Sequence, residues 1–297
     1  LSTNVKERLD FSCALLDAAG RLVVNAPHIP VHLGALGVCV RAVAKALDLA
    51  PGDTAITNHP GFGGSHLPDI TLITPVHSAA GTLLGYAASR AHHAEIGGIR
   101  PGSMPPAATR LAEEGVIIAP RLLVAAGAPR WEDLRRLLQS GLYPSRAPED
   151  NLADLEAALA ANHRGCGHLQ QLAVTHGDDA VARYMADLRL EADRGVRAAL
   201  AAMPDGVYRA RGRLDDGAAI EVAIEVAGER ARIDFTGSAP VHAGNLNATP
   251  AIVQSAVVYV LRLLVEKSLP LNEGFLDPVE VRLPPGMLNP PFTPAGD

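Results

Sequence analysis

The chain has 297 residues and a net charge of −6; 48% of its residues are hydrophobic and 20% are charged. These totals are typical of a globular protein with a sizeable core. They include no cluster of Lys and Arg suited to a phosphate backbone, and aromatic residues reach only 4%, too few for stacking platforms. We therefore expect no nucleic acid as partner.

Cysteine content and hydropathy bear on the compartment. Cys13, Cys39 and Cys166 are too few and odd in number for a disulfide framework, and they fit a reducing environment. The longest apolar stretch, residues 251–265, is too short and too interrupted to cross a membrane, and the N-terminus lacks the order of a signal peptide. We expect a cytoplasmic protein without a membrane segment.

Short apolar runs separated by Gly and Pro dominate the first 130 residues and predict a β-rich lobe. The pattern predicts two strands in 13–26 around a turn at Ala19–Gly20, a helix over 33–49, a short strand at 54–57, and a β-hairpin with arms 70–76 and 82–93. A Gly/Pro-rich loop follows at 96–109, and loops of this length are often functional.

The pattern becomes helical from Trp131 to Met203 and predicts two helices broken at His176–Gly177, the second ending at Pro204. Beyond it, period-two alternation predicts antiparallel strands over 206–214, 219–228 and 231–237, then a buried helix over 249–267 and a strand over 278–286. The predicted fold class is mixed α/β (α+β). It comprises a β-rich metal-site lobe (1–130), a helical segment (131–204) and an α+β lobe with an antiparallel sheet and a packed helix (205–297).

The stretch GGSHLPDI, residues 63–70, carries His66 and Asp69 three residues apart on a segment that Pro68 stiffens. An imidazole and a carboxylate on a rigid loop suit a Zn, Mn or Fe site. On these four residues alone the favoured interpretation is a turn that His66 caps and in which Asp69 bonds its own backbone. The predicted hairpin changes this balance. With its turn centred on Ala79, the hairpin brings Asp69 opposite about position 90.

His92 and His93 lie close to that position, in the run RAHHAE. Adjacent strand residues point to opposite faces, so only one of the two should join His66 and Asp69, and spacing does not choose between them. Two imidazoles and one carboxylate would leave coordination positions open, as a catalytic metal requires. Solvated or core histidines are the alternative interpretation.

Other polar residues have two interpretations each. His28 and His32, in a Pro-rich loop that opens a helix, could contact substrate or form a helix-entry turn. Asn245 and Asn247 could hydrogen-bond an amide or carboxylate substrate, or form Asx-turns. The run NHRGCGH contains His163, Cys166 and His168, but it lacks the second Cys/His pair that structural zinc needs.

The sequence contains no GxxxxGK[ST], complete GxGxxG or GxSxG motif, so we expect no nucleotide pocket or serine nucleophile on this chain.

Several long stretches, in order from end to end, resemble the hydantoinase B/oxoprolinase family. The runs that carry the resemblance include STNVKERLDFSCALLDAAGRLVVNAPHIPVHLGAL, PGDTAITNHPGFGGSHLPDITLITPV, SRAHHAEIGGIRPGSMP and DFTGSAPVHAGNLNATPA. The family includes subunits of N-methylhydantoinase, 5-oxoprolinase and caprolactamase, and the large subunits of ketone carboxylases. The resemblance implies a fragment covering roughly the first half of such a subunit, incomplete at the C-terminus.

The resemblance also implies a function. It implies a metal-bearing subunit in a hetero-oligomer with a hydantoinase A-type ATP-binding subunit, which phosphorylates a lactam or imide substrate. The metal-bearing subunit then opens the ring of 5-oxoproline or a hydantoin, a hydrolysis belonging to glutathione metabolism in the case of 5-oxoproline.

The family's metal ligands correspond to Asp10, His66, Asp69 and His92, so the resemblance selects His92 over His93 and adds Asp10. His93 or Glu95 could then move protons.

The sequence departs from the family pattern at two positions. His59 stands where Asp is usual, which bears on activity and metal preference, and Glu95 replaces the more common Asp. Two alternative functions stay open. One is an ATP-dependent ketone carboxylase; the other is an inactive, truncated subunit that only binds a partner.

Overall fold

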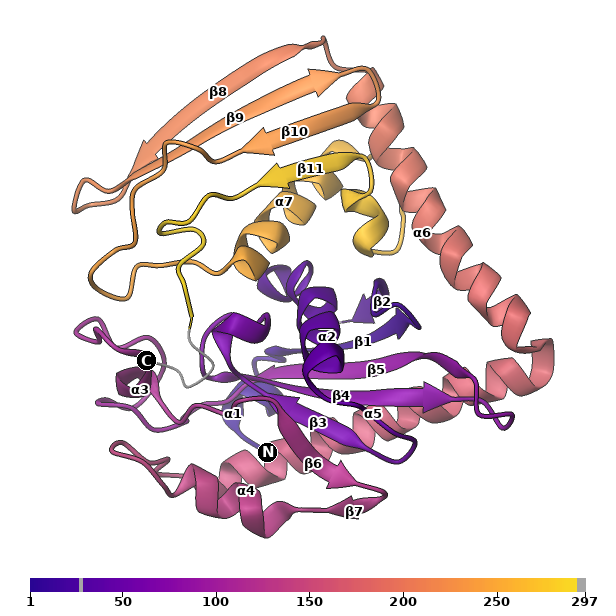
Figure 1. Cartoon of the computed structure of the whole chain (residues 1–297), viewed down its shortest axis with the longest axis vertical. Helices are drawn as coiled ribbons and strands as arrows, with labels where there is room; N and C mark the ends of the chain where they lie inside the picture. The colour runs from indigo at the N-terminus through magenta and orange to yellow at the C-terminus, as the bar shows by residue number, and fades with distance from the viewer. Residues whose placement is uncertain (27–28, 293–297) are drawn as a thin grey trace.

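Two β-sheets of different size organise the chain, and the computed structural model describes residues 1–26 and 29–292 (Figure 1). The larger sheet has seven strands in the order β2-β1-β5-β4-β3-β6-β7, and every neighbouring pair is antiparallel. Its strands are β1 (Phe11–Asp17), β2 (Leu22–Ala26), β3 (Thr54–Thr57), β4 (Asp69–His77), β5 (Leu83–His92), β6 (Arg121–Ala125) and β7 (Ala128–Pro129). The strands predicted within residues 13–93 are confirmed, whereas β6 and β7 were not predicted.

The central strands β4 and β5 are buried almost throughout because helices cover both faces of the sheet. On one face, α2 (Ala35–Ala46) packs Leu36, Val40 and Val43 over the sheet. On the other face lie α4 (Trp131–Leu138) and the first half of α5 (Pro148–His176), where Leu152 and Leu155 pack against residues of β3 and β4. The predicted domain boundary at residue 130 stays a prediction, and this second core joins residues from both sides of it.

The predicted helical break is confirmed: α5 ends at His176 and α6 (Asp178–Ala201) begins after Gly177, whose φ is +88°. Figure 1 shows α6 running from the larger sheet to the smaller one. Its residues Ala192, Val196 and Leu200 pack into the core beneath the smaller sheet, which we call the core of the second lobe.

The smaller sheet has the order β11-β10-β9-β8 and packs on α7 (Pro250–Leu264). Its strands are β8 (Gly206–Arg213), β9 (Ala219–Ala227), β10 (Arg230–Asp234) and β11 (Val279–Arg282). The first three strands are antiparallel as predicted, but β11 pairs with β10 in parallel. The physical reason is the long connection through α7, which returns the chain to the same end of the sheet before β11 begins.

Short helical turns occupy the connections: α1 (Thr3–Lys6), η1 (Pro30–His32), η2 (Pro60–Phe62), α3 (Leu111–Glu114) and η3 (Glu273–Leu276). Among the described residues, no helix has the length and apolar character needed to cross a membrane.

A buried carboxylate joins the two lobes. Glu273 accepts two hydrogen bonds from the guanidinium of Arg41, each 2.8 Å long, and one of 2.7 Å from the backbone N–H of Leu22. The contact is so close that a Cβ atom at Gly37 would lie 2.4 Å from a Glu273 carboxylate oxygen. The lobes therefore meet through a specific polar contact, and a side chain at position 37 would displace the Glu273 carboxylate from its present place.

We expect Glu273→Gln to lower the free energy of unfolding by about 1–3 kcal/mol, because hydrogen bonds to a charged group are lost in a buried position. Urea unfolding followed by circular dichroism measures this. The control is Glu280→Gln, which removes an exposed ion pair with Arg232 and should cost less than about 1 kcal/mol. Equal losses in the two variants would contradict a special role for Glu273.

Candidate metal centre

The loop before β4 carries two of the predicted ligands in a rigid frame. η2 ends at Gly63, whose φ is +83°, and a Cβ atom there would lie 2.6 Å from the backbone nitrogen of Cys39. From the other lobe, the Thr249 hydroxyl donates to the Gly64 carbonyl at 3.2 Å. The loop is therefore held between α2 and the start of α7, and glycine is required where it touches α2.

Arg90 ties the same loop to the sheet, although its side chain is fully buried in β5. Its guanidinium donates to the carbonyl of Gly63 at 2.8 Å, to the hydroxyl of Ser65 at 3.2 Å, and to the hydroxyl of Thr71 at 2.8 Å. Sequence reasoning missed Arg90. The only signal was a charged residue in the middle of a strand that otherwise reads as apolar.

The register of the hairpin decides which histidine meets Asp69. The hydrogen bond from Ser78 N–H to the Thr82 carbonyl centres the turn one residue later than predicted, and a bulge between Val76 and His77 shifts the register further. Asp69 therefore pairs directly with His92. The backbone N–H of His92 donates to the Asp10 carbonyl at 3.0 Å, which brings the N-terminal segment to the same place.

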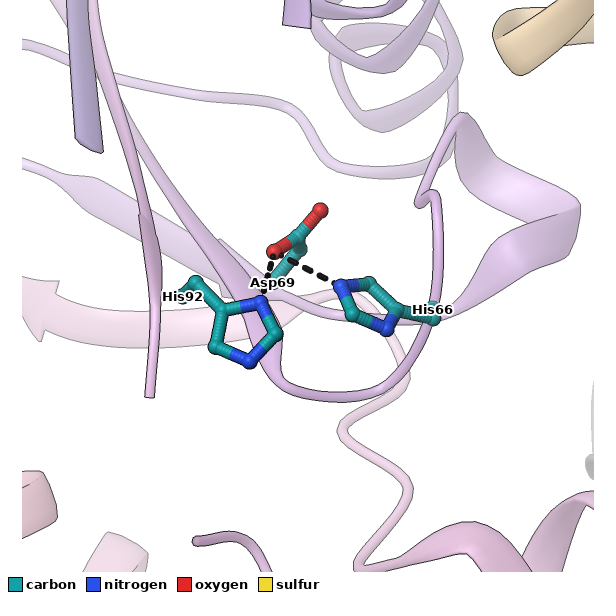
Figure 2. Close-up of side chains that lie close together, drawn as sticks. All are labelled: His66, Asp69 and His92. Atoms are coloured by element: carbon teal, nitrogen blue, oxygen red, sulfur yellow. Dashed lines mark ion pairs between the residues drawn. The ribbon is translucent and has the colours of Figure 1, made fainter. Parts of the chain in front are cut away.

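His66, Asp69 and His92 form a cluster, and one ligand atom from each lies within 4.8 Å of the others. Asp69 Oδ1 is 3.0 Å from His66 Nε2 and 3.3 Å from His92 Nδ1. Figure 2 shows this oxygen directed at both imidazoles, while the second carboxylate oxygen points away from them. Asp69 is 1% exposed, whereas the two histidine side chains are 14% and 18% exposed, so the imidazoles form the accessible side of the cluster.

The electrostatics of the cluster follow from the burial of Asp69. Burial opposes its ionisation, but hydrogen bonds from His32, His66 and His92 outweigh this cost and hold the pKa of Asp69 well below its usual range. For His92 burial lowers the pKa, yet the carboxylates of Asp69 and Asp10 raise it above the ordinary value. The carboxylate is therefore charged at neutral pH, which suits a cation.

The donor set fits a divalent transition metal. Ligand bonds of about 2.0–2.1 Å at tetrahedral angles place neighbouring ligand atoms about 3.3 Å apart. The Asp69 Oδ1 distances of 3.0 and 3.3 Å to the two imidazole nitrogens are close to that spacing, and all three ligand atoms lie within 4.8 Å of one another. Imidazole is a borderline ligand and carboxylate a hard one, and Zn, Mn and Fe accept this combination.

Asp10 and His32 flank the cluster on different sides. Asp10 Oδ2 lies 3.9 Å from His92 Nδ1, and its side chain is 34% exposed, so it borders the cluster from the accessible side. His32 is fully buried, and its Nε2 lies 3.5 Å from Asp69 Oδ2. The substrate contact predicted for His32 stays a prediction, but the side chain has no exposed surface and faces a ligand. His28 lies outside the described residues.

The two predicted proton carriers are held in place by other contacts. His93 is 1% exposed, its Nδ1 accepts a 3.2 Å hydrogen bond from the side-chain amide of Asn151, and burial lowers its pKa to about 4. Glu95 binds the guanidinium of Arg146 at 2.9 Å and the hydroxyl of Ser145 at 2.9 Å. Their roles in proton transfer stay predictions, and both fix the loop after β5 to the start of α5.

A cavity of about 540 Å³ opens beside His66, between the two lobes. Its walls are largely apolar, and its polar lining includes His66, Arg110, Glu114, Asn245 and Asn247. Asn245 donates to the Pro105 carbonyl at 2.8 Å, and Asn247 braces its own loop through the backbone of His242 and Gly244. The two amides therefore line the cavity, and their predicted contact with substrate stays a prediction.

Glu114 is the cavity carboxylate that sequence reasoning missed. It ends α3, in the connection after the Gly/Pro-rich loop, so nothing in its local pattern indicated that the fold brings it to His66. Burial raises its pKa, although the nearby His66 opposes the shift.

The remaining sequence candidates lie elsewhere. His59 is fully buried; its Nδ1 accepts a 3.0 Å hydrogen bond from Gly61 N–H, and its ring contacts Phe62 edge-on. It braces the loop before His66. His163 and His168 are exposed on α5, and within the described residues no metal-binding group includes them or Cys166.

Comparison with known proteins identifies the family. The Hydantoinase B/oxoprolinase profile matches residues 1–296. The chain belongs to this family. It is 46% identical to the 5-oxoprolinase of Saccharomyces cerevisiae over 97% of its own length and 24% of that protein. It is 43% identical to 5-oxoprolinase 1 of Arabidopsis thaliana, over 96% of the chain and 25% of that protein. The chain thus spans about a quarter of these relatives.

A solved structure shares the fold. The ATP-dependent caprolactamase of Pseudomonas jessenii matches with a TM-score of 0.87 and 30% identity, over 95% of this chain and 49% of that chain. Acetone carboxylase in its nucleotide-free form matches with a TM-score of 0.85 at 21% identity, over 97% of this chain and 41% of that chain. The family and the mixed α/β fold expected from the sequence are confirmed.

We expect His92→Ala to bind Zn²⁺ or Mn²⁺ at least about 100-fold more weakly than the unaltered chain, because a ligand is removed and not only a group that supports one. Metal content by mass spectrometry and chelator competition measure this. The matched control is His163→Ala, an exposed imidazole on α5. Unchanged metal binding by His92→Ala would rule out this ligand assignment.

Proposed function

We propose that the chain is the metal-bearing part of a subunit in an ATP-dependent cyclic-amide hydrolase, which opens 5-oxoproline or hydantoin-type rings. The observation that carries the proposal is the cluster of His66, Asp69 and His92 beside a cavity large enough for a small ring. Membership of the hydantoinase B/oxoprolinase family and the 5-oxoprolinase relatives support it.

A separate subunit of the hydantoinase A type supplies ATP in this proposal. The chain has no P-loop motif, and one relative is named the beta subunit of caprolactamase, which is 31% identical over 93% of the chain. The partner transfers the γ-phosphoryl group of ATP to the carbonyl oxygen of the lactam or imide and releases ADP. In the cavity beside His66 water then adds to the ring carbon, the C–N bond breaks to give an amine and an acyl phosphate, and a second water releases the phosphate. A hetero-oligomer follows from this division of labour.

The residues would act as follows. His66, Asp69 and His92, with Asp10 at the accessible edge, would hold a Zn, Mn or Fe ion, whose Lewis acidity assists attack of water on the ring carbon. The apolar walls of the cavity exclude bulk water and position the ring. Glu114 lines the same cavity as His66, so it is placed to hand a proton to the leaving ring nitrogen.

The cytoplasm is the compartment we propose. Cys13, Cys39 and Cys166 are free thiols in the structure, as expected in a reducing environment.

We expect Glu114→Gln to lower turnover by about 10²–10⁴-fold, the usual contribution of a positioned proton carrier. Glu95→Gln should lower stability more than turnover, because Glu95 fixes the backbone of Arg146 and Gly97. Steady-state kinetics and thermal unfolding of both variants separate these effects. If Glu95→Gln lost more turnover than Glu114→Gln while its stability stayed unchanged, Glu95 and not Glu114 would be the proton carrier.

The function is tested by co-expressing the subunit that contains this chain with its ATP-binding partner. ATP hydrolysis is measured with 5-oxoproline, hydantoin and acetone. We expect turnover with a cyclic amide that disappears in Asp69→Asn. Turnover with acetone and bicarbonate alone would instead establish a ketone carboxylase, and no turnover with any substrate by a metal-loaded complex would contradict the proposal.

A further inference from the structure

A line of three buried side chains leads from β1 to the candidate metal centre. The hydroxyl of Ser12 lies 2.9 Å from His32 Nδ1, and His32 Nε2 lies 3.5 Å from Asp69 Oδ2. The three residues come from β1, from η1 and from the first position of β4, and they are 0%, 0% and 1% exposed. The fold therefore assembles this line from segments far apart in the sequence.

The two oxygens of Asp69 have different neighbours. Oδ1 faces His66 and His92, whereas Oδ2 faces His32. His32 does not belong to the group of mutually close ligand atoms. Within the described residues neither His32 Nε2 nor Asp69 Oδ2 makes a short hydrogen bond, and the two buried atoms face each other at 3.5 Å. His32 thus lies behind the carboxylate, on the side away from the accessible imidazoles.

The chemistry of the three groups determines which of them donates and which accepts along this line. An ionised carboxylate only accepts hydrogen bonds, so the His32 nitrogen that faces Asp69 must carry the hydrogen. In a neutral imidazole the other nitrogen, Nδ1, is then an acceptor, and the Ser12 hydroxyl is its donor. The carboxylate of Asp69 therefore selects the tautomer with Nε2–H, and the Ser12 hydroxyl supports it by donating to Nδ1.

We propose that His32 is a positioning residue for the metal centre: it supports Asp69 Oδ2 from behind so that Oδ1 faces the ion, and Ser12 braces His32 by donating to its Nδ1. The inference rests on the proposed metal centre. Groups that hold a ligand in this way typically change metal affinity by about 10- to 100-fold.

The test measures Zn²⁺ affinity of the metal-free chain by competition with a chromophoric chelator. His32→Leu, which removes the donor, should bind about 10- to 100-fold more weakly. His32→Gln, which keeps an N–H donor, should recover most of that loss, and Ser12→Ala should fall between them. The control is His163→Gln, an exposed imidazole on α5.

Coordination separates positioning from direct binding. X-ray absorption of the Zn²⁺-loaded His32→Gln protein should show the same number of imidazole ligands as the unaltered protein. One imidazole fewer would make His32 a ligand and overturn the proposal, and so would unaltered affinity in His32→Leu and Ser12→Ala. If His32→Leu does not fold, His32→Gln and Ser12→Ala still decide. Absence of Zn²⁺ binding by the unaltered chain would instead contradict the metal centre itself.

Discussion

The site depends on the burial of one carboxylate. Asp69 begins β4 with almost no exposure to solvent, and an ionised group in that position requires donors on every side. Three histidines surround the carboxylate: His66 and His92 lie 3.0 and 3.3 Å from one oxygen, and His32 faces the other at 3.5 Å. The two imidazoles at Oδ1 are partly exposed, so this face of the cluster stays accessible although the carboxylate itself is buried.

The rest of the fold keeps these donors in place. Glycine at position 63 lets the loop lie against α2, Arg90 ties that loop to the sheet, and Thr249 reaches it from the second lobe. Because the second lobe also forms one wall of the cavity, its docking through Glu273 bears on the shape of the site as well as on stability. The geometry of the cavity thus depends on the contact between the two lobes.

Local sequence patterns predicted some of the candidate ligands but could not choose others, and the difference has a physical reason. His66 and Asp69 lie on one short loop, so their spacing alone brought them together. The choice between His92 and His93 depended on a turn and a bulge, which period-two alternation does not reveal. The resemblance to the family selected His92, and the register agrees with that selection. His32 was associated with substrate because its burial depends on how η1 packs against α2 and α7.

Glu95 and Glu114 show the same limit for the cavity. Glu95 lies two residues after the double histidine and was therefore considered as a proton carrier, yet its carboxylate is bound by Ser145 and Arg146. Glu114 has no motif around it, and only the folding of residues 96–120 brings it to the cavity beside His66.

By itself the sequence determined the strands of the hairpin, the break between the two long helices, the HxxD pair and the family, because these depend on local periodicity, on glycine and on ordered motifs. The tertiary structure decided which side chains converge. The sheet register, the parallel pairing of β11 and the depth of Asp69 and His32 all depend on contacts between segments far apart in the chain, and no local pattern encodes those distances.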